Sequence, residues 1–329
     1  MAEVGRRQFL MTAGALVVAP CAARARTEQR ARRLGTLDGS SAAGRSVNWG
    51  AFHQRMRELG YVEGPRYSVE HRWADGAFAR LPQLAAELVD LNPGVIVTGG
   101  TPAALAAKKA TTAIPVVFCG VTDPLGSGLV QSLARPGGNL TGMANLNSEV
   151  VGKWLELMRA IAPAVKTLAF VTDTGNVSSM GAFRSLRDAA HRIGLDARAY
   201  DASRAEIVAE AFHAIADERI DGVVVGASGR MLPHRQAIAD AIARLRLPAV
   251  FATPQYPEVG GLLSYSADHL ALWVKAADKV HRILEGANPA DLPVEQASTF
   301  LLVVNLRAAK SMGITVPQSI LLRADRVIE

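Results

Sequence analysis

Short apolar runs and longer amphipathic segments alternate along most of the chain. Val95-Ile96-Val97 is an uninterrupted apolar run, which is typical of a strand buried on both faces of a sheet. Leu81, Leu84 and Leu88 recur every three or four positions, which is the spacing of one face of a helix. The alternation predicts an α/β fold with parallel sheets covered by helices on both faces. We expect strands near 33–37, 67–73, 95–97, 116–121, 167–171, 196–200, 222–225 and 249–251.

The alternation runs twice, which predicts two doubly wound, Rossmann-like lobes. The first series ends near Asp123, and the second begins with a helix expected at about 148–161. The last part of the chain is too short for a third domain, so we expect it to complete both lobes and their hinge. The expected N-terminal lobe is 33–143 plus about 258–290, and the expected C-terminal lobe with the hinge is 144–257 plus about 291–329.

The N-terminus has the pattern of an export signal. Arg6 and Arg7 precede an uncharged apolar run, and Ala23-Arg24-Ala25 resembles a cleavage site. The Arg-Arg-x-Phe-Leu arrangement favours a twin-arginine signal, with an ordinary secretory signal as the alternative. We therefore expect residues 1–25 to be a signal peptide cleaved near Ala25, and the protein to act in the periplasm. Pro20 before Cys21 argues against a lipoprotein.

Net charge and cysteine content bear on two further properties, nucleic-acid binding and disulfide bonding. Cleavage would remove three arginines and one glutamate, so the net charge would fall from +6 to +4. Basic residues are spread along the chain, and we expect no nucleic-acid partner. Cys119 would be the one cysteine left, so no internal disulfide is expected, and its apolar neighbours predict a buried structural thiol.

Ligands of open parallel sheets bind beyond the carboxyl ends of the strands. The residues that follow the expected strands are mostly small, polar or glycine. They are 38–41 (which includes Ser40 and Ser41), 98–101, 122–123, 172–176, 226–230 and 253–256 (which includes Gln255 and Tyr256). This composition would suit a hydrogen-bonding cleft, and it is also that of ordinary turns between strands and helices.

Thr101-Pro102 and Asp123 form the most informative pair among these turns. Thr is a good N-cap and Pro is favoured at the first helical position, so a helix N-terminus could attract a carboxylate here. Asp123 ends the neighbouring strand, where it could hold an ammonium group. Together they would suit an α-amino acid. The alternative is that Thr101 only caps its helix and Asp123 only forms a turn before Pro124.

Catalytic and metal-binding patterns are poor. Gly226-Ala227-Ser228-Gly229-Arg230 half matches the nucleophile elbow of hydrolases, because Arg230 stands where the last glycine belongs. The glycines of 34–39 are wrongly spaced for a dinucleotide fingerprint, and the seven histidines form no pair at metal-ligand spacing. We expect a protein that is not an enzyme and that needs no cofactor or metal.

Several longer segments resemble a bacterial family of ABC-transporter substrate-binding proteins. The most specific is the run Gly126-Ser127-Gly128-Leu129-Val130-x-Ser132-Leu133-Ala134-Arg135-Pro136-Gly137-Gly138-Asn139-Leu140-Thr141-Gly142. Gly100-Thr101-Pro102-Ala103, Val121-Thr122-Asp123-Pro124, Gly261-Leu262-Leu263-Ser264-Tyr265 and Asp291-Leu292-Pro293-Val294-Glu295 continue the likeness. It covers the chain from about residue 33 to its end.

The resemblance implies a type I periplasmic binding protein, with two lobes, three hinge crossings and closure on a ligand. It also implies a small-molecule ligand, an ABC permease as the partner and a monomeric protein. Relatives include aromatic amino-acid binders. By position the resemblance assigns ligand contacts to Thr101, Ala103 and Asp123 in the first lobe. In the second lobe it assigns them to Asp173, Thr174, Asn176 and Ser228.

The set of ligand-binding candidates combines the turns with the resemblance. It consists of Ser40, Ser41, Thr101, Pro102, Ala103, Asp123, Asp173, Thr174, Asn176, Ser228, Gln255 and Tyr256. One departure from the family is Asp173-Thr174-Gly175, where many relatives have Asn-Pro. Two alternatives to an importer component stay open: a periplasmic sensor that signals to a membrane receptor, and an exported hydrolase that uses Ser228 or Asp123.

Overall fold

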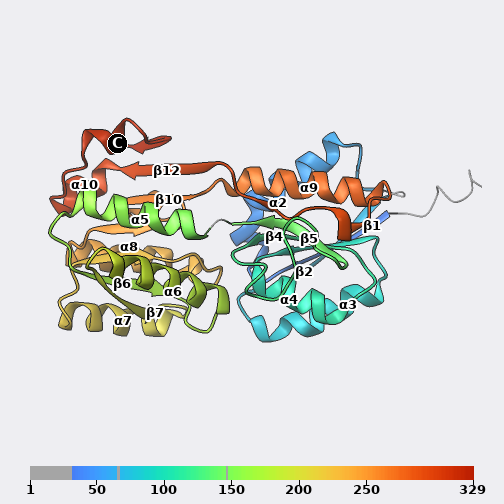
Figure 1. Ribbon diagram of the computed structural model, residues 1–329, viewed down its shortest axis with the longest axis horizontal. Helices are drawn as coiled ribbons and strands as arrows, with labels where there is room; N and C mark the ends of the chain where they lie inside the picture. The colour runs from blue at the N-terminus through green and yellow to red at the C-terminus, as the bar shows by residue number, and fades with distance from the viewer. Residues whose placement is uncertain (1–31, 65–66, 146) are drawn as a thin grey trace, which may run out of the picture.

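Two lobes lie side by side along the long axis of the molecule (Figure 1). The computed structural model describes residues 32–64, 67–145 and 147–329. The predicted signal peptide, residues 1–25, therefore lies outside the described residues. Each lobe is built on its own β-sheet, and the predicted α/β class with two mostly parallel sheets is confirmed.

The first lobe has a six-stranded, all-parallel sheet in the order β11-β5-β4-β3-β1-β2. Helices α2 and α9 pack on one face of this sheet, and α3 and α4 cover the other face. Its strands are β1 (Arg32–Asp38), β2 (Tyr67–Trp73), β3 (Val95–Gly99), β4 (Val116–Val121), β5 (Leu140–Ala144) and β11 (Glu295–Gln296). Its helices are α2 (Ala42–Glu58), α3 (Leu81–Asp90), α4 (Thr101–Ala110) and α9 (His269–Leu284), with 3-10 turns η2 (Phe78–Arg80) and η5 (Pro289–Asp291).

The second lobe has a seven-stranded sheet in the order β13-β12-β10-β9-β8-β6-β7. Helices α5, α6 and α10 cover one face, and α7 and α8 cover the other. Its strands are β6 (Thr167–Thr172), β7 (Asp196–Asp201), β8 (Gly222–Val225), β9 (Ala249–Phe251), β10 (Leu263–Ala267), β12 (Phe300–Asn305) and β13 (Arg326–Ile328). Its helices are α5 (Asn147–Ile161), α6 (Val177–Arg192), α7 (Ala205–Asp217), α8 (Arg235–Leu245), α10 (Leu306–Met312) and α11 (Gln318–Leu321), with η3 (Leu232–His234) and η4 (Pro257–Val259).

The chain crosses between the lobes in three places. It leaves the first lobe between β5 and α5, returns between β10 and α9, and leaves again between β11 and β12. The changes of sheet fall after Ala144, Ala267 and Gln296, and the lobe boundaries expected from the sequence were 143–144, about 258 and about 290. Strand β10 belongs to the second sheet and pairs with β12 in the antiparallel sense. The other ladders between the described strands are parallel, and the sequence did not predict this antiparallel one.

Parallel strands bring their carboxyl ends to one edge of each sheet, and here these two edges face each other across the gap between the lobes. Residues that follow β1, β3 and β4 of the first sheet share a cavity with residues that follow β6, β8 and β9 of the second. Cys119 lies deep in β4, where burial raises the pKa of its thiol, as expected for a structural cysteine. Among the described helices, none combines the length and hydrophobicity that crossing a bilayer requires.

Candidate functional site

A cavity of about 100 Å³, here called the central cavity, lies between the lobes. Both lobes supply its wall, and most of the lining side chains are small or polar. The lining residues include Asp38, Ser40, Arg45, Phe78, Gly99, Thr101, Pro102, Thr122, Asn145, Asn176, Ser178, Ala227, Ser228, Gly229, Thr253, Gln255 and His269. The turns that the sequence singled out therefore do meet in space.

Asp38 anchors the wall on the side of the first lobe. Its carboxylate is almost fully buried at the end of β1 and accepts hydrogen bonds from the Ser40 backbone N–H (2.8 Å) and Trp49 Nε1 (3.1 Å). Arg45 Nε lies 3.8 Å from the same carboxylate, which partly balances its charge. A Cβ at Gly99 would overlap this carboxylate, so the glycine leaves room for it. Asp38 thus fixes Arg45 beside the cavity.

Helix α4 begins one residue earlier than the sequence predicted. Gly100, with φ of +82°, is the N-cap, and Thr101 and Pro102 are the first two helical residues. The predicted side-chain cap by Thr101 is therefore wrong, because glycine adopts this left-handed backbone without a Cβ clash. Thr101 and Pro102 line the cavity, so the free N–H groups of the helix end are beside it. Ala103 is fully buried in the core below and is no part of the cavity wall.

Asp173 supports the wall on the side of the second lobe. It is almost fully buried after β6, where it accepts a hydrogen bond from Ser228 Oγ (3.2 Å) and lies 3.7 Å from Arg230 Nη1. Burial raises the pKa of this carboxyl, and Arg230 and Ser228 oppose that rise. Ser228 lines the cavity, whereas Asp173 stands behind it. The hydrogen bond to Asp173 fixes the orientation of the Ser228 hydroxyl at the cavity wall.

The other candidates of the second lobe divide between the cavity and other roles. Asn176 caps α6 by accepting from Ser178 N–H (3.0 Å) and lines the cavity. Thr174 Oγ1 donates to the Asp201 carboxylate at the end of β7 (2.8 Å), and Thr174 does not line the central cavity. Gln255 lines the cavity, but Tyr256 is 1% exposed and stacks on Phe251 in the core, with ring centroids 4.7 Å apart. The Tyr256 side chain therefore lies in the core and does not line the central cavity.

Asp123 lies in an adjoining cavity of about 540 Å³, not in the one that Thr101 lines. Its carboxylate accepts from Gly126 N–H (2.8 Å), and its backbone carbonyl accepts from Ser127 Oγ (2.5 Å). The two cavities share Thr122, Asn145 and Ser178. Thr101 and Asp123, the two groups predicted to bind an α-amino acid together, therefore lie in neighbouring cavities, and the Asp123 carboxylate bonds to its own turn.

A smaller space of about 50 Å³, here called the back chamber, continues from the central cavity into the second lobe. The two spaces share Thr122, Asn145, Ser178, Ala227 and His269. The back chamber is otherwise lined by Val150, Trp154, Phe170, Thr172, Ser179, Ala182, Ala252, Ser266 and Ala267. Its wall is therefore mostly apolar and also carries several hydroxyl groups.

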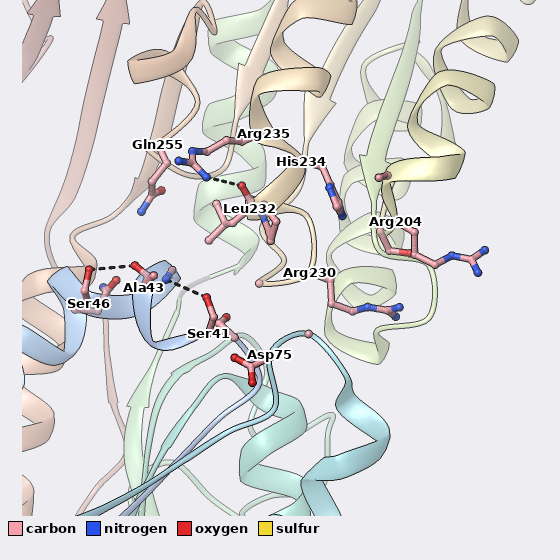
Figure 2. A pocket seen from close by; sticks show the side chains of 18 of the residues that line it. Ser41, Ala43, Ser46, Asp75, Arg204, Arg230, Leu232, His234, Arg235 and Gln255 are labelled. Atoms are coloured by element: carbon pink, nitrogen blue, oxygen red, sulfur yellow. Dashed lines mark hydrogen bonds between the residues drawn. The ribbon is translucent and has the colours of Figure 1, made fainter.

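On the solvent side, the central cavity opens into a mouth of about 820 Å³. Ser40, Asn48 and Gln255 line both spaces, and Ser41, the N-cap of α2, lines the mouth. Figure 2 shows the mouth between residues of the first lobe and several basic side chains of the second. The labelled residues are Ser41, Ala43, Ser46 and Asp75 from the first lobe, and Arg204, Arg230, Leu232, His234, Arg235 and Gln255 from the second.

The lobes touch each other at the border of this mouth. The Arg230 guanidinium of the second lobe lies 5.5 Å from the ring centroid of Phe78 in the first lobe, which is cation–π geometry. A Cβ at Gly229 would lie 2.6 Å from Ser40 Oγ of the first lobe, closer than van der Waals contact permits. The two walls of the cleft therefore approach closely, and a glycine makes that approach possible.

Sequence reasoning missed Arg45, Asn145 and His269. His269 lines both the central cavity and the back chamber, and burial lowers its pKa to about 4, with Arg45 adding to the effect and Asp268 opposing it. The imidazole is therefore neutral near pH 7. Within the described residues, no cluster of histidine, cysteine or acidic side chains forms a metal site.

Comparison with known protein families settles the class. The pattern of the family described as "ABC transporter substrate binding protein" matches residues 41–328, most of the chain. The chain belongs to this family. A similar curated protein is the tyrosine-binding protein of Clostridioides difficile strain R20291, which is 25% identical over 261 residues, or 79% of this chain and 75% of that protein.

Two solved structures of family-like proteins have nearly the same fold. A conserved domain protein from Vibrio cholerae is 30% identical, with a TM-score of 0.86 over 91% of this chain and all of that one. The ABC domain from Streptococcus pneumoniae in complex with L-Trp is 26% identical, with a TM-score of 0.85 and the same coverage. The fold is that of type I periplasmic binding proteins, as the family resemblance implied.

Proposed function

We propose that this protein is the solute-binding component of an ABC importer and that its solute is an amino acid or a related zwitterion. In this proposal the chain is exported to the periplasm behind a cleaved twin-arginine signal. It acts there as a monomer and presents the captured solute to a membrane permease. Family membership supports the binding role, and the tyrosine-binding relative and the relative with L-Trp support an amino-acid ligand.

The observation that carries the proposal is a set of buried polar atoms around the central cavity that have no hydrogen-bond partner among the described residues. One is Nε of the Arg45 guanidinium, which lines the cavity together with Thr101 and Pro102 at the N-terminus of α4. Others are the amide oxygens Asn145 Oδ1 and Gln255 Oε1. Buried polar atoms are seldom left unpaired in folded proteins, and unpaired ones at a cavity are candidates for ligand contact.

These atoms match the two charges of a zwitterion. Arg45 and the helix N-terminus would bind a carboxylate, because both present N–H groups and positive charge. The amide oxygens of Asn145 and Gln255 would accept hydrogen bonds from an ammonium group. In this arrangement the buried Asp38 keeps Arg45 in place instead of contacting the ligand itself.

Capture would work by a shift between open and closed lobes. Three crossings join the lobes, which is compatible with hinge motion, and the contacts of Arg230 with Phe78 and of Gly229 with Ser40 would form only when the cleft is closed. A solute that bridges both walls stabilises the closed form, and the permease would recognise that form.

Calorimetric titration of the purified chain with each of the twenty protein L-amino acids tests the proposal. We expect at least one to bind in the micromolar range or tighter. Arg45→Gln should weaken that binding at least tenfold, the order of loss for a charged hydrogen bond. Asp123→Asn is the matched control, since its carboxylate bonds to its own turn, and it should change the affinity less than threefold.

Two results would contradict this proposal in different ways. If none of the amino acids binds, the ligand class is wrong. If an amino acid binds and only Asp123→Asn weakens it, the ligand lies in the adjoining cavity. Circular dichroism melts of both variants without ligand show whether either change has simply unfolded the protein.

A further inference from the structure

The back chamber is closed at the far end by large apolar side chains. Trp154 and Phe170 are almost fully buried there, and Val150, Ala182 and Ala252 complete the apolar wall. Trp154 Nε1 donates to the backbone carbonyl of Tyr265 (2.8 Å), so the polar edge of the indole is already paired. The chamber is joined to the central cavity and to the cavity beside Asp123 through Thr122, Asn145 and Ser178, which line all three spaces.

Ser178, which the back chamber shares with the central cavity, has a buried hydroxyl without a hydrogen-bond partner among the described residues, and three more such hydroxyls line the back chamber alone. These three belong to Thr172, Ser179 and Ser266, whose exposed fractions are 0%, 4% and 2%. They come from β6, α6 and β10, so three separate elements bring them to one small space. A hydroxyl buried without a partner is unfavourable, and a polar group inserted into the chamber would relieve that cost.

The volume limits what such a group can be. A cavity of about 150 Å³ is the size that holds a benzene ring. The back chamber offers about 50 Å³, which by proportion admits about two or three non-hydrogen atoms. Tyr256 lies in the core, so it supplies no aromatic platform to the site. The space is too small for the ring of tyrosine or tryptophan.

We propose that the back chamber receives the side chain of the solute and selects a compact, hydroxyl-bearing amino acid over aromatic ones. The inference rests on the proposed function, because it assumes a zwitterion held in the central cavity. Thr172, Ser179 and Ser266 determine specificity: they hydrogen-bond a side-chain hydroxyl, while Trp154 and Phe170 set the size limit. The ligand class would then differ from the ligands in the names of the two relatives.

The first test compares five probes by calorimetry: L-serine, L-threonine, L-alanine, L-tyrosine and L-tryptophan. We expect serine or threonine to bind at least tenfold tighter than alanine, which lacks the hydroxyl, and at least a hundredfold tighter than either aromatic amino acid. Tyrosine or tryptophan binding as tightly as serine and threonine would overturn the inference while leaving the amino-acid function intact. Absence of binding by all twenty amino acids would instead overturn both.

The second test uses paired variants that remove one hydroxyl each. Ser266 and Ser264 both lie in β10, and both have buried hydroxyls without partners, but only Ser266 lines the back chamber. Ser266→Ala should weaken binding of the hydroxyl-bearing probe about three- to tenfold and leave alanine binding unchanged. Ser264→Ala should change neither. Equal effects of both variants, or equal losses for both probes, would contradict a direct contact.

Thr172→Val and Thr98→Val form a second pair of a test variant and its control. Both threonines are fully buried in a strand and have an unpaired hydroxyl, but Thr98 lies in β3 and does not line the chamber. Thr172→Val should reproduce the selective loss, and Thr98→Val should not. If Thr172→Val and Ser266→Ala both bind the hydroxyl-bearing probe like the wild type, the chamber does not contact the side chain.

Discussion

Two histidines, His53 and His71, lie in an aromatic cluster of the first lobe. His53 stacks on Trp49, with ring centroids 5.9 Å apart, and lies 5.4 Å from the ring of His71. Burial, together with the neighbouring His71 and Arg57, lowers the pKa of His53 to about 4. His53 is therefore held neutral in the fold, although it titrates near pH 6.5 in an unfolded chain.

This histidine should make the protein less stable in acid. Between pH 6.5 and pH 4 the unfolded chain binds a proton at this position that the folded chain does not, so the free energy of unfolding falls as the pH falls. Replacing His53 by Gln should reduce the loss of melting temperature between pH 7 and pH 5 by roughly 2–4 °C. His213→Gln, on the exposed face of α7, is the control. Parallel melting curves for wild type and His53→Gln would contradict the assignment.

At the residue scale, the sequence identified positions better than orientations. Ser40, Thr101, Asn176, Ser228 and Gln255 line the cavity as expected, because residues after parallel strands must reach the same edge. A turn position does not say which way its side chain points, and this is why Ala103 and Tyr256 proved to be core residues. Arg45 was missed because it lies inside a helix, one turn after its start.

At the scale of elements, the pairing of β4 with β5 leaves no room for a side chain at one register position. Gly142 pairs with Phe118, and a Cβ at Gly142 would overlap the Phe118 carbonyl oxygen and ring. The strands cannot separate without breaking their ladder. Only a residue without a side chain fits here, so this glycine is required by packing.

Gly142→Ala should therefore destabilise the first lobe by at least about 2 kcal/mol, because overlap with backbone cannot be relieved by a rotamer change. Urea unfolding followed by circular dichroism measures this loss. Gly138→Ala is a matched control on the loop before β5, where an added Cβ would meet open space, and it should shift stability by less than about 0.5 kcal/mol. A Gly142→Ala protein as stable as this control would show that the strands can separate.

Element types followed from the periodicity, whereas sheet membership did not. The uninterrupted apolar runs became buried strands, as β3 and β8 illustrate. Leu263–Ala267 reads as one more short strand, and nothing in its own pattern tells which lobe it joins or that β12 pairs with it in the antiparallel sense. Long-range pairing decides both, and local periodicity carries no information about it.

At the scale of the whole molecule, the approach of Gly229 to Ser40 should control how far the lobes close. A methyl group at residue 229 would lie within 2.6 Å of Ser40 Oγ, so Gly229→Ala should hold the cleft partly open. The solute then loses contact with one wall, and its affinity should fall about tenfold or more, the cost of a steric clash of about 1–3 kcal/mol. Calorimetry measures the affinity, and small-angle scattering with saturating solute measures closure.

Two further variants separate closure from damage to the wall. Gly175→Ala is the control in the same lobe, since its added Cβ would make only ordinary contact, 3.5 Å from Asp173. Adding Ser40→Ala to Gly229→Ala removes the clashing oxygen and should restore part of the affinity. An unaltered affinity in Gly229→Ala, or a loss that Ser40→Ala does not relieve, would rule out a closure contact at this point.

The three crossings also determine the order in which the lobes can be completed during synthesis. The first lobe is complete only with α9 and β11, and α9 brings Trp273 against Trp49 with ring centroids 4.3 Å apart. The second lobe is complete only with β12 and β13. A ribosome must therefore make nearly the whole chain before either core closes. It follows that no single cut yields two intact halves, and that a nascent chain ending before residue 297 exposes apolar surface to chaperones and proteases.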